Sequence, residues 1–441
     1  MSQRLFDRNT ALSWLLFTGW FLLPVAFYGE SEIIRTNIEG YFWVMGVGLP
    51  FYFIVTKASV TSMLALFWSV VVLRVYSLRQ PLHWLDLSLL IFVLSPFLSM
   101  FKGNTTFISN FESALYLVVV WGVPYFVGRR FITSDTKLIS SAEVFVIISL
   151  IGSPFFIIEF FMSPIFYEYI YGFHPFNSDG ELRYFNFRPM LLLEHGNQLG
   201  MWYSTAAIIA FGFWKFSNKQ KIFFLKVSHV HHYIVFILLL SQSRGAIILY
   251  AIGVSIIYLL TCFRKKILII YFMLALLVIT AVPLMFAKQI YSFAKTTPLG
   301  QQTVQVIKDI GGGSLTWRIG SDLKNAQVLK ENFFTGLGTI NWNQDNVRSW
   351  GAILLILGGY GIGGLIAWST LILYPLFLTV KQLNLEREKS EIELSWFVLI
   401  IAITLVANWL DAFLNSFFIT SLLIWTGGLV NISQNKVNYY R

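Results

Sequence analysis

Three polar stretches interrupt an otherwise apolar chain, and each contains an arginine that could bind an anion. The arginines are Arg188, Arg244 and Arg318. A guanidinium group stays charged at physiological pH and grips phosphate oxygens in a planar fork. We therefore expect these side chains to bind a phosphate group if the fold brings them together. A lone arginine near a membrane surface can instead extend its charge into water.

The first stretch also contains ionisable and amide side chains close to its arginine. Pro189 is typical of a first helical turn, so the pattern predicts a helix that begins near Arg188 on the outer membrane face. Glu194, His195 and Asn197 would then lie just inside an apolar helix. Ionisable residues are costly in that position and are usually functional.

The second stretch, Ser241 to Ala246, surrounds Arg244 with small polar residues in the middle of a long apolar run. A charge in such a position needs a partner or a water-filled cavity. Arg244 therefore either contributes to a site or marks the tip of a hairpin.

The third stretch predicts a short interfacial helix followed by a glycine turn. Apolar residues recur at helical spacing from Thr316 to Glu331, with Arg318 in the first turn. Gly336 and Gly338 flank one leucine and allow a tight turn in which backbone amides approach a ligand. No predicted strand precedes this glycine-rich segment, so a dinucleotide-binding loop does not fit.

The composition is that of a membrane protein, so we expect membrane helices to position these three stretches. Of the 441 residues, 56% are hydrophobic and 12% are charged, whereas soluble domains carry about a quarter charged residues. The mean hydropathy of +0.67 is typical of a polytopic membrane protein. The net charge of +10 then indicates basic short loops and contact with anionic lipid rather than nucleic acid.

Cofactor and metal chemistry find little support in the sequence. Cys262 is the single cysteine, which excludes an internal disulfide and a thiolate cluster. His229, His231 and His232 lie together on a basic loop without acidic companions, so we expect no metal there.

Apolar runs predict an all-α fold with about twelve or thirteen transmembrane helices. The expected spans are 11–28, 40–57, 58–77, 84–101, 109–128, 141–163, 189–213, a broken pair in 232–262, 267–287, 351–379, 394–413 and 416–432. They divide the chain into N-terminal membrane helices (1–128), central membrane helices with a loop at 164–188 (129–287), a large polar loop (288–350) and C-terminal membrane helices (351–441).

Lysine and arginine clusters predict the orientation because they concentrate in cytoplasmic loops. The clusters near residues 130, 220, 265, 387 and 436 all become cytoplasmic if 232–262 is a hairpin that begins and ends inside. The loops 164–188 and 288–350 then face outside, and the C-terminus is cytoplasmic.

The first five apolar runs conflict with this scheme. Starting from a cytoplasmic Arg4 and Arg8, five crossings would bring Arg129 to the wrong side. Either one run does not span the membrane, or the N-terminus lies outside.

The order of the motifs resembles the O-antigen polymerase and O-antigen ligase superfamily. In that family an arginine precedes a histidine or asparagine, a Ser-Arg-Gly-Ala segment follows, and an arginine-led helix ends in a Gly-x-Gly turn within a large periplasmic loop. The match covers roughly residues 185–370 and consists of Arg188, His195, Asn197, Ser243-Arg244-Gly245-Ala246, Arg318, Gly336-Leu337-Gly338 and Gly358 to Gly364.

This resemblance implies a GT-C-like enzyme of the bacterial inner membrane. Such an enzyme transfers glycan from undecaprenyl diphosphate at the periplasmic face, with inversion and without a metal or other cofactor. Its partners would be the lipid-linked oligosaccharide, membrane lipids, a flippase and a chain-length regulator, with no nucleic acid.

The same resemblance suggests roles for individual residues. Arg188, Arg244 and Arg318 would bind the diphosphate, because fixed guanidinium groups stabilise a leaving group that gains negative charge. Asn197, Gly336 and Gly338 would make the other substrate contacts. The candidates for the general base that deprotonates the acceptor hydroxyl are Glu194 and His195, with Asp345 behind them.

Two departures from the family pattern affect the choice of activity. Gly196 stands where the family has proline, and no histidine follows His232, although similar ligases have one after the large loop. We therefore expect a polysaccharide polymerase. The alternatives are an O-antigen ligase and a glycan flippase or other transporter, although no repeat of the two halves, which transporters often have, is visible.

Overall fold

The computed structural model describes residues 10–25, 56–73, 81–102, 105–172, 182–217, 219–263, 286–309, 313–338, 351–383, 389–413, 415 and 418–439. Most of these residues are helical, and the only paired strands among them form a short hairpin, β1 (Lys221–Ile222) and β2 (Leu225–Lys226). The first half contains α1 (Thr10–Leu22), α4 (Lys57–Phe67) with η3 (Trp68–Val72), α5 (Trp84–Leu94) with η4 (Ser95–Lys102), α6 (Phe107–Leu117) with η5 (Val118–Gly122), α7 (Val123–Phe131), α8 (Asp135–Met162), α9 (Phe166–Tyr171) and α10 (Gly196–Phe216). The second half contains α11 (Val227–Leu240), α12 (Arg244–Phe263), α14 (Ala287–Thr296), α15 (Pro298–Ile307), α16 (Gly313–Val328), η7 (Leu329–Asn332), α18 (Ala352–Leu383), α19 (Lys389–Asp411), η8 (Thr420–Leu422) and α20 (Leu423–Tyr439).

Several helices are long and apolar enough to cross a bilayer. Among the described residues, five segments meet both criteria, namely Trp84–Lys102, Phe107–Phe131, Asp135–Met162, Arg244–Thr261 and Ala352–Val380. Four shorter apolar helices accompany them, at Thr10–Leu22, Lys57–Val72, Val227–Leu240 and Ser395–Asp411. The chain is therefore an all-α membrane protein, as predicted. The expected count of about twelve spans and the GT-C-like arrangement stay predictions.

Polar contacts bring several basic loops to one end of the bundle. Arg129, near the end of α7, donates to Asp86 Oδ1 at 2.8 Å and to Gln434 Oε1 at 3.0 Å. These bonds join the start of α5 to the C-terminal half of α20. Lys219, which follows α10, pairs with Glu143 near the start of α8. We call this end of the bundle the basic end, and the opposite end, where α10 begins, the site end.

The described N-terminal helices bring Thr10 and Arg129 to the same end of the bundle. Ser13 of α1 bonds to Ser141 near the start of α8, so α1 begins at the basic end. At the other end of α1, the backbone oxygen of Val25 accepts the N–H of Lys57, the first residue of α4, at 3.3 Å. The described helices α1, α4, α5 and the α6–α7 unit therefore traverse the bundle four times, which brings both Thr10 and Arg129 to the basic end. Most of the run predicted at 40–57 lies outside the described residues.

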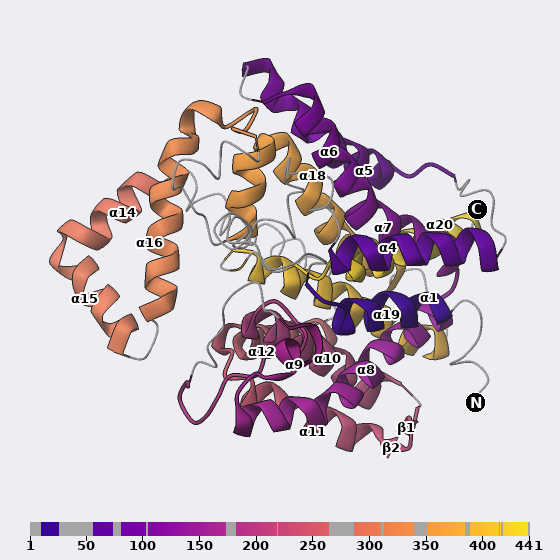
Figure 1. Ribbon diagram of the computed structural model, residues 1–441. Helices are drawn as coiled ribbons and strands as arrows, with labels where there is room; N and C mark the ends of the chain where they lie inside the picture. The colour runs from indigo at the N-terminus through magenta and orange to yellow at the C-terminus, as the bar shows by residue number, and fades with distance from the viewer. Residues whose placement is uncertain are drawn as a thin grey trace.

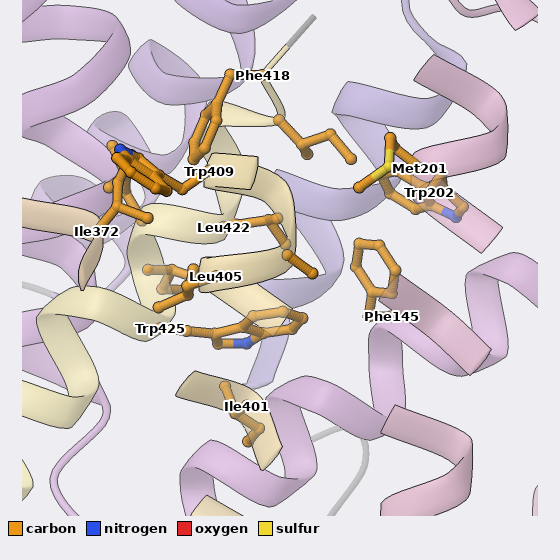
Figure 2. Close-up of a cluster of buried hydrophobic side chains, with 14 of the residues drawn as sticks. Phe145, Met201, Trp202, Ile372, Ile401, Leu405, Trp409, Phe418, Leu422 and Trp425 are labelled. Carbon is orange, nitrogen blue, oxygen red and sulfur yellow. The ribbon is translucent and has the colours of Figure 1, made fainter. Parts of the chain in front are cut away.

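Aromatic side chains and close helix contacts build the core. Trp202 of α10 stacks on Phe145 of α8 with ring centroids 4.1 Å apart, and Trp425 of α20 lies 5.5 Å from Phe145 (Figure 2). Gly128 lets α7 approach α20, because a Cβ atom there would lie 2.0 Å from the backbone oxygen of Ile424. Small residues at such contacts are typical of membrane helix pairs, in which packing rather than water exclusion drives association.

Helices α14, α15 and α16 form an arm at the edge of the bundle (Figure 1). Within the arm, α14 packs on both α15 and α16. The side chains of Lys288, Lys295 and Lys308 are exposed there. The arm belongs to the polar segment 288–350 that the sequence assigns to the outside of the membrane, and its helix α16 carries Arg318.

Candidate functional site

Arg188 and Arg318 belong to one hydrogen-bonded cluster at the site end. Nη2 of Arg188 donates to Oδ1 of Asn197. Nδ2 of Asn197 donates to Oδ1 of Asn415 at 2.9 Å, and Nη1 of Arg318 donates to the same Asn415 oxygen at 2.6 Å. Three hydrogen bonds thus connect the two guanidinium groups, and each is accepted by an uncharged amide oxygen. We call these four residues the arginine–asparagine cluster.

Asp411 fixes the orientation of the central amide. Nδ2 of Asn415 donates to Oδ1 of Asp411 at 2.7 Å, so the amide oxygen of Asn415 faces Asn197 and Arg318. The backbone oxygen of Asn415 accepts the N–H of Ala352 at 3.1 Å. The cluster therefore sits where α19 ends and α18 begins, with Asp411 and Asn415 both buried.

Helix α16 brings Arg318 to the cluster by docking on the start of α18. Asp322, one turn after Arg318, accepts the N–H of Gly351 through Oδ2 at 3.1 Å. A carboxylate is favourable at this position because a helix N-terminus carries partial positive charge. The predicted helix is present, but it begins at Gly313, so Arg318 lies in its second turn rather than its first.

The segment before α10 is not helical, which corrects the expectation of a helix starting near Arg188. Helix α10 begins only at Gly196. Glu159 of α8 accounts for the difference, because its Oε2 accepts the N–H groups of Met190 and Leu191 at 2.9 and 2.7 Å. Leu191 also has a φ of 52°, in the left-handed region that interrupts a helix. This loop backbone, rather than a helical turn, directs the buried Arg188 side chain toward Asn197.

Two glycines of α10 allow the close contacts on which the cluster depends. A Cβ atom on Gly196 would lie 2.5 Å from Nε of Arg188. A Cβ atom on Gly200 would lie 2.4 Å from Cβ of Ser243, in the turn that precedes Arg244. Glycine at these positions therefore lets both polar segments lie directly against the helix.

Glu194 takes part in a buried ion pair next to the cluster. Its Oε1 lies 3.3 Å from Nζ of Lys57, and both side chains are fully buried. Oε1 of Gln198 accepts from Lys57 Nζ at 3.4 Å and from the Glu194 N–H at 3.1 Å. The pair joins the start of α4 to the loop that carries Arg188. This setting favours a role in positioning that loop.

His195 caps the first turn of α10. Its Nδ1 accepts the N–H of Asn197 at 3.0 Å, and its side chain is half-buried. A neutral imidazole that accepts at Nδ1 carries its proton on Nε2. In this tautomer His195 can donate a hydrogen bond from Nε2 to a phosphate or hydroxyl oxygen.

Arg244 lies beside the cluster rather than within its chain of hydrogen bonds. It is exposed, and its guanidinium carbon lies 4.1 Å from the ring centroid of Tyr184. The preceding residue, Ser243, donates to Oδ1 of Asn197 at 3.5 Å. Helices α11 and α12 join here, so Arg244 marks the tip of the predicted helix pair and also borders the cluster.

Gly336 and Gly338 form the predicted turn, and both have positive φ values, of 71° and 82°. Among the described residues, the turn contacts helix α18 and the segment that precedes α6. Leu337 N–H donates to the backbone oxygen of Gly358 in α18 at 2.7 Å. A Cβ atom on Gly338 would lie 2.3 Å from the Thr105 side chain. The turn therefore packs the end of the arm against the bundle, and Asp345 lies outside the described residues.

Sequence reasoning missed Asn415, Asp411, Lys57 and Glu159 as parts of the site. A usable signal existed for two of them, because Asp411 and Asn415 are spaced by four residues at the end of an apolar helix. Polar residues with that spacing share one helix face. Lys57 and Glu159 are each a single charged residue in an apolar run. Such a residue is expected to be paired or functional, but the sequence does not show which residue is its partner.

Comparison with known proteins adds no relative to these observations. The chain matches no protein-family model, and no curated protein matches it significantly. The fold and the site therefore define a class alone: an all-α membrane protein with an arginine–asparagine cluster at one end of its helical bundle.

Proposed function

We propose that the protein is a polymerase of a bacterial surface or secreted polysaccharide. It transfers glycan from an undecaprenyl diphosphate carrier to another lipid-linked repeat unit at the periplasmic face of the inner membrane. O-antigen, capsule and exopolysaccharide are all products of this class. The C-terminus is cytoplasmic in this proposal, and the basic end of the bundle faces the cytoplasm in accordance with the positive-inside rule.

One observation carries the proposal. Arg188 and Arg318, selected as diphosphate ligands from separate segments of the sequence, are joined through Asn197 and Asn415 at the end of the bundle opposite the basic loops. Two guanidinium groups held in fixed positions suit a lipid diphosphate. Arg244 borders the cluster and would contact the same ligand from an exposed position.

The reaction consists of one inverting displacement. The acceptor hydroxyl attacks the anomeric carbon of the donor glycan while the bond to the diphosphate oxygen breaks. The diphosphate leaves with the bonding electron pair, and the arginines stabilise its added charge. A base takes the hydroxyl proton, and the candidates stay Glu194, His195 and Asp345. His195 in its present tautomer would instead donate to an oxygen of the substrate.

Substitution of the two arginines tests the proposal in cells that make the native lipid-linked glycan. We expect Arg188→Gln and Arg318→Gln each to reduce polymer about ten- to a hundredfold, because each removes a charge-assisted hydrogen bond of about 1.5–3 kcal/mol. Arg130→Gln is the matched control, because it removes the same charge at the basic end.

The species left on the carrier distinguishes the activities. A polymerase defect leaves single repeat units on the outer leaflet. Long carrier-linked chains would indicate a ligase, and single units retained on the inner leaflet would indicate a flippase. Full-length polymer from the double arginine variant would reject the proposed site.

A further inference from the structure

The β1–β2 hairpin at the basic end carries two exposed aromatic rings on a two-residue turn. The strand register pairs Ile222 with Leu225, so Phe223 and Phe224 form the turn between them. These two side chains are 62% and 68% exposed, and their ring centroids lie 4.6 Å apart. Two-residue hairpin turns favour glycine and asparagine rather than aromatic residues. The tip of the hairpin therefore presents an unusual apolar surface.

The backbone of the turn is strained at Phe223. Its φ is 57°, in the left-handed region that bulky residues rarely adopt. Glycine would adopt this conformation without the steric cost. Strain of this kind often marks a functional position. Because the ring of Phe223 is mostly exposed, packing within the bundle does not explain why an aromatic residue stands there.

The strands also place two lysines directly opposite each other. Lys221 and Lys226 are register partners on the exposed face of the hairpin, whereas Ile222 is buried on the other face. Like charges that lie directly opposite across two strands destabilise a hairpin. Neither lysine forms an ion pair with a residue that the structure describes. An anion bound at this face would remove the repulsion.

The hairpin lies next to a segment that is apolar enough to enter the membrane. It contacts the apolar helix α11, whose first residue, Val227, directly follows Lys226. The N–H of Val227 donates to the backbone oxygen of Gln220 at 3.1 Å, which fixes the hairpin to the start of α11 (Figure 1). At the end of α10, Nζ of Lys215 lies 3.7 Å from the ring centroid of Trp214. Because tryptophan is enriched at membrane interfaces, these neighbours place the hairpin near the surface of the bilayer.

We propose that the hairpin is a surface that docks on anionic lipid. Phe223 and Phe224 insert among the lipid headgroups, and Lys221 and Lys226 bind the lipid phosphates. Aromatic rings favour the headgroup region, and lysines close to it are attracted by anionic lipid. This one ligand accounts for the exposed rings, the strained turn and the opposed lysines. The contact is independent of the proposed catalytic function, and it fixes the basic end of the bundle at the bilayer surface.

Fluorine NMR of the full chain in lipid nanodiscs tests this proposal. Para-fluorophenylalanine takes the place of Phe224, and the bilayer is either phosphatidylcholine alone or an equal mixture with phosphatidylglycerol. One relaxation agent is a nitroxide attached to the lipid, and the other is a water-soluble gadolinium chelate. The variant is Lys221→Gln/Lys226→Gln. Its matched control is Lys288→Gln/Lys308→Gln, which removes two exposed lysines from the arm.

The lipid nitroxide should relax the fluorine about threefold more strongly in the mixed bilayer than in phosphatidylcholine alone, because anionic lipid gathers at the two lysines. The hairpin variant should lose this difference, and the arm variant should keep it. An equal effect in both bilayers would refute the role of the lysines. Relaxation by the aqueous agent alone would place the tip in water, where only a soluble partner would meet it, and would overturn the proposal.

A second variant, Phe223→Gly, separates lipid contact from a structural role of the ring. Glycine relieves the strained φ, so the variant should be at least as stable in detergent as the original chain. In the mixed bilayer, relaxation of the fluorine at position 224 by the lipid nitroxide should decrease. Unchanged relaxation would exclude insertion of the Phe223 ring, and lower stability in detergent would assign that ring to packing within the chain. Either result would overturn the proposal.

Discussion

The buried pair of Lys57 and Glu194 gives the sharpest test of how the site is held. The two groups are 3.3 Å apart and fully buried. Removal of one partner from such a pair leaves an uncompensated charge and typically costs about 3–5 kcal/mol. We therefore expect Lys57→Met to lower the free energy of unfolding by about that amount. The double variant Lys57→Met/Glu194→Leu should lie within about 1–2 kcal/mol of the original chain, because apolar residues of similar volume can replace a buried ion pair.

Equilibrium unfolding in mixed micelles of a mild and a denaturing detergent measures these differences. Lys215→Met is the matched control, because Lys215 is exposed and its Nζ lies 3.7 Å from the ring centroid of Trp214. That contact is worth about 0.5–1 kcal/mol. A cost below about 1 kcal/mol for Lys57→Met, or a double variant as unstable as the sum of the two single ones, would refute the reasoning.

The same variants also test the role of Glu194. If Glu194 positions the loop that carries Arg188, the double apolar variant should still make polymer, because it removes both buried charges together. If Glu194 is the general base, the double variant should be stable but inactive. Stability and polymer length measured on one set of variants thus distinguish a positioning residue from a catalytic one.

Two further predictions concern the same loop. Glu159→Gln should weaken each hydrogen bond from the N–H groups of Met190 and Leu191 by about 1–1.5 kcal/mol, because a neutral amide oxygen replaces a carboxylate acceptor. Amide hydrogen exchange should then become faster in residues 188–195, and unchanged exchange would contradict the role of Glu159. Gly196→Ala should displace Arg188 and reduce polymer, because the new Cβ atom would lie 2.5 Å from its Nε. Gly245→Ala, where a Cβ atom meets no atom within 4 Å, should leave polymer unchanged, and equal losses in the two variants would argue against this steric explanation.

Local sequence patterns were sufficient to predict the class of protein and the positions of most of the described helices. The apolar runs at 84–101, 109–128, 141–163 and 351–379 each correspond to a helix, with ends that differ by up to six residues. A segment in a bilayer must satisfy its backbone hydrogen bonds internally, which favours a helix. The interruption around Arg244 likewise predicted the turn between α11 and α12. These features depend on composition and spacing, which the sequence contains directly.

The start of α10 shows where local reasoning fails. Pro189 suits a helix start, yet the helix begins at Gly196. The carboxylate of Glu159, on helix α8, accepts hydrogen bonds from the backbone N–H groups of Met190 and Leu191. These bonds hold the segment after Pro189 as a loop. Nothing near Pro189 in the sequence reveals that contact.

The candidate site depended even more on tertiary structure. The sequence by itself determined that Arg188, Arg244 and Arg318 interrupt apolar surroundings, since a charge in such a place must have a partner or solvent. Only the folded chain decided that Asn415 and Asp411, at the far end of α19, link Arg188 to Arg318 and leave Arg244 at the edge. The physical reason is that hydrogen bonds act over about 3 Å in space, whereas the residues that make them are separated along the chain by whole helices.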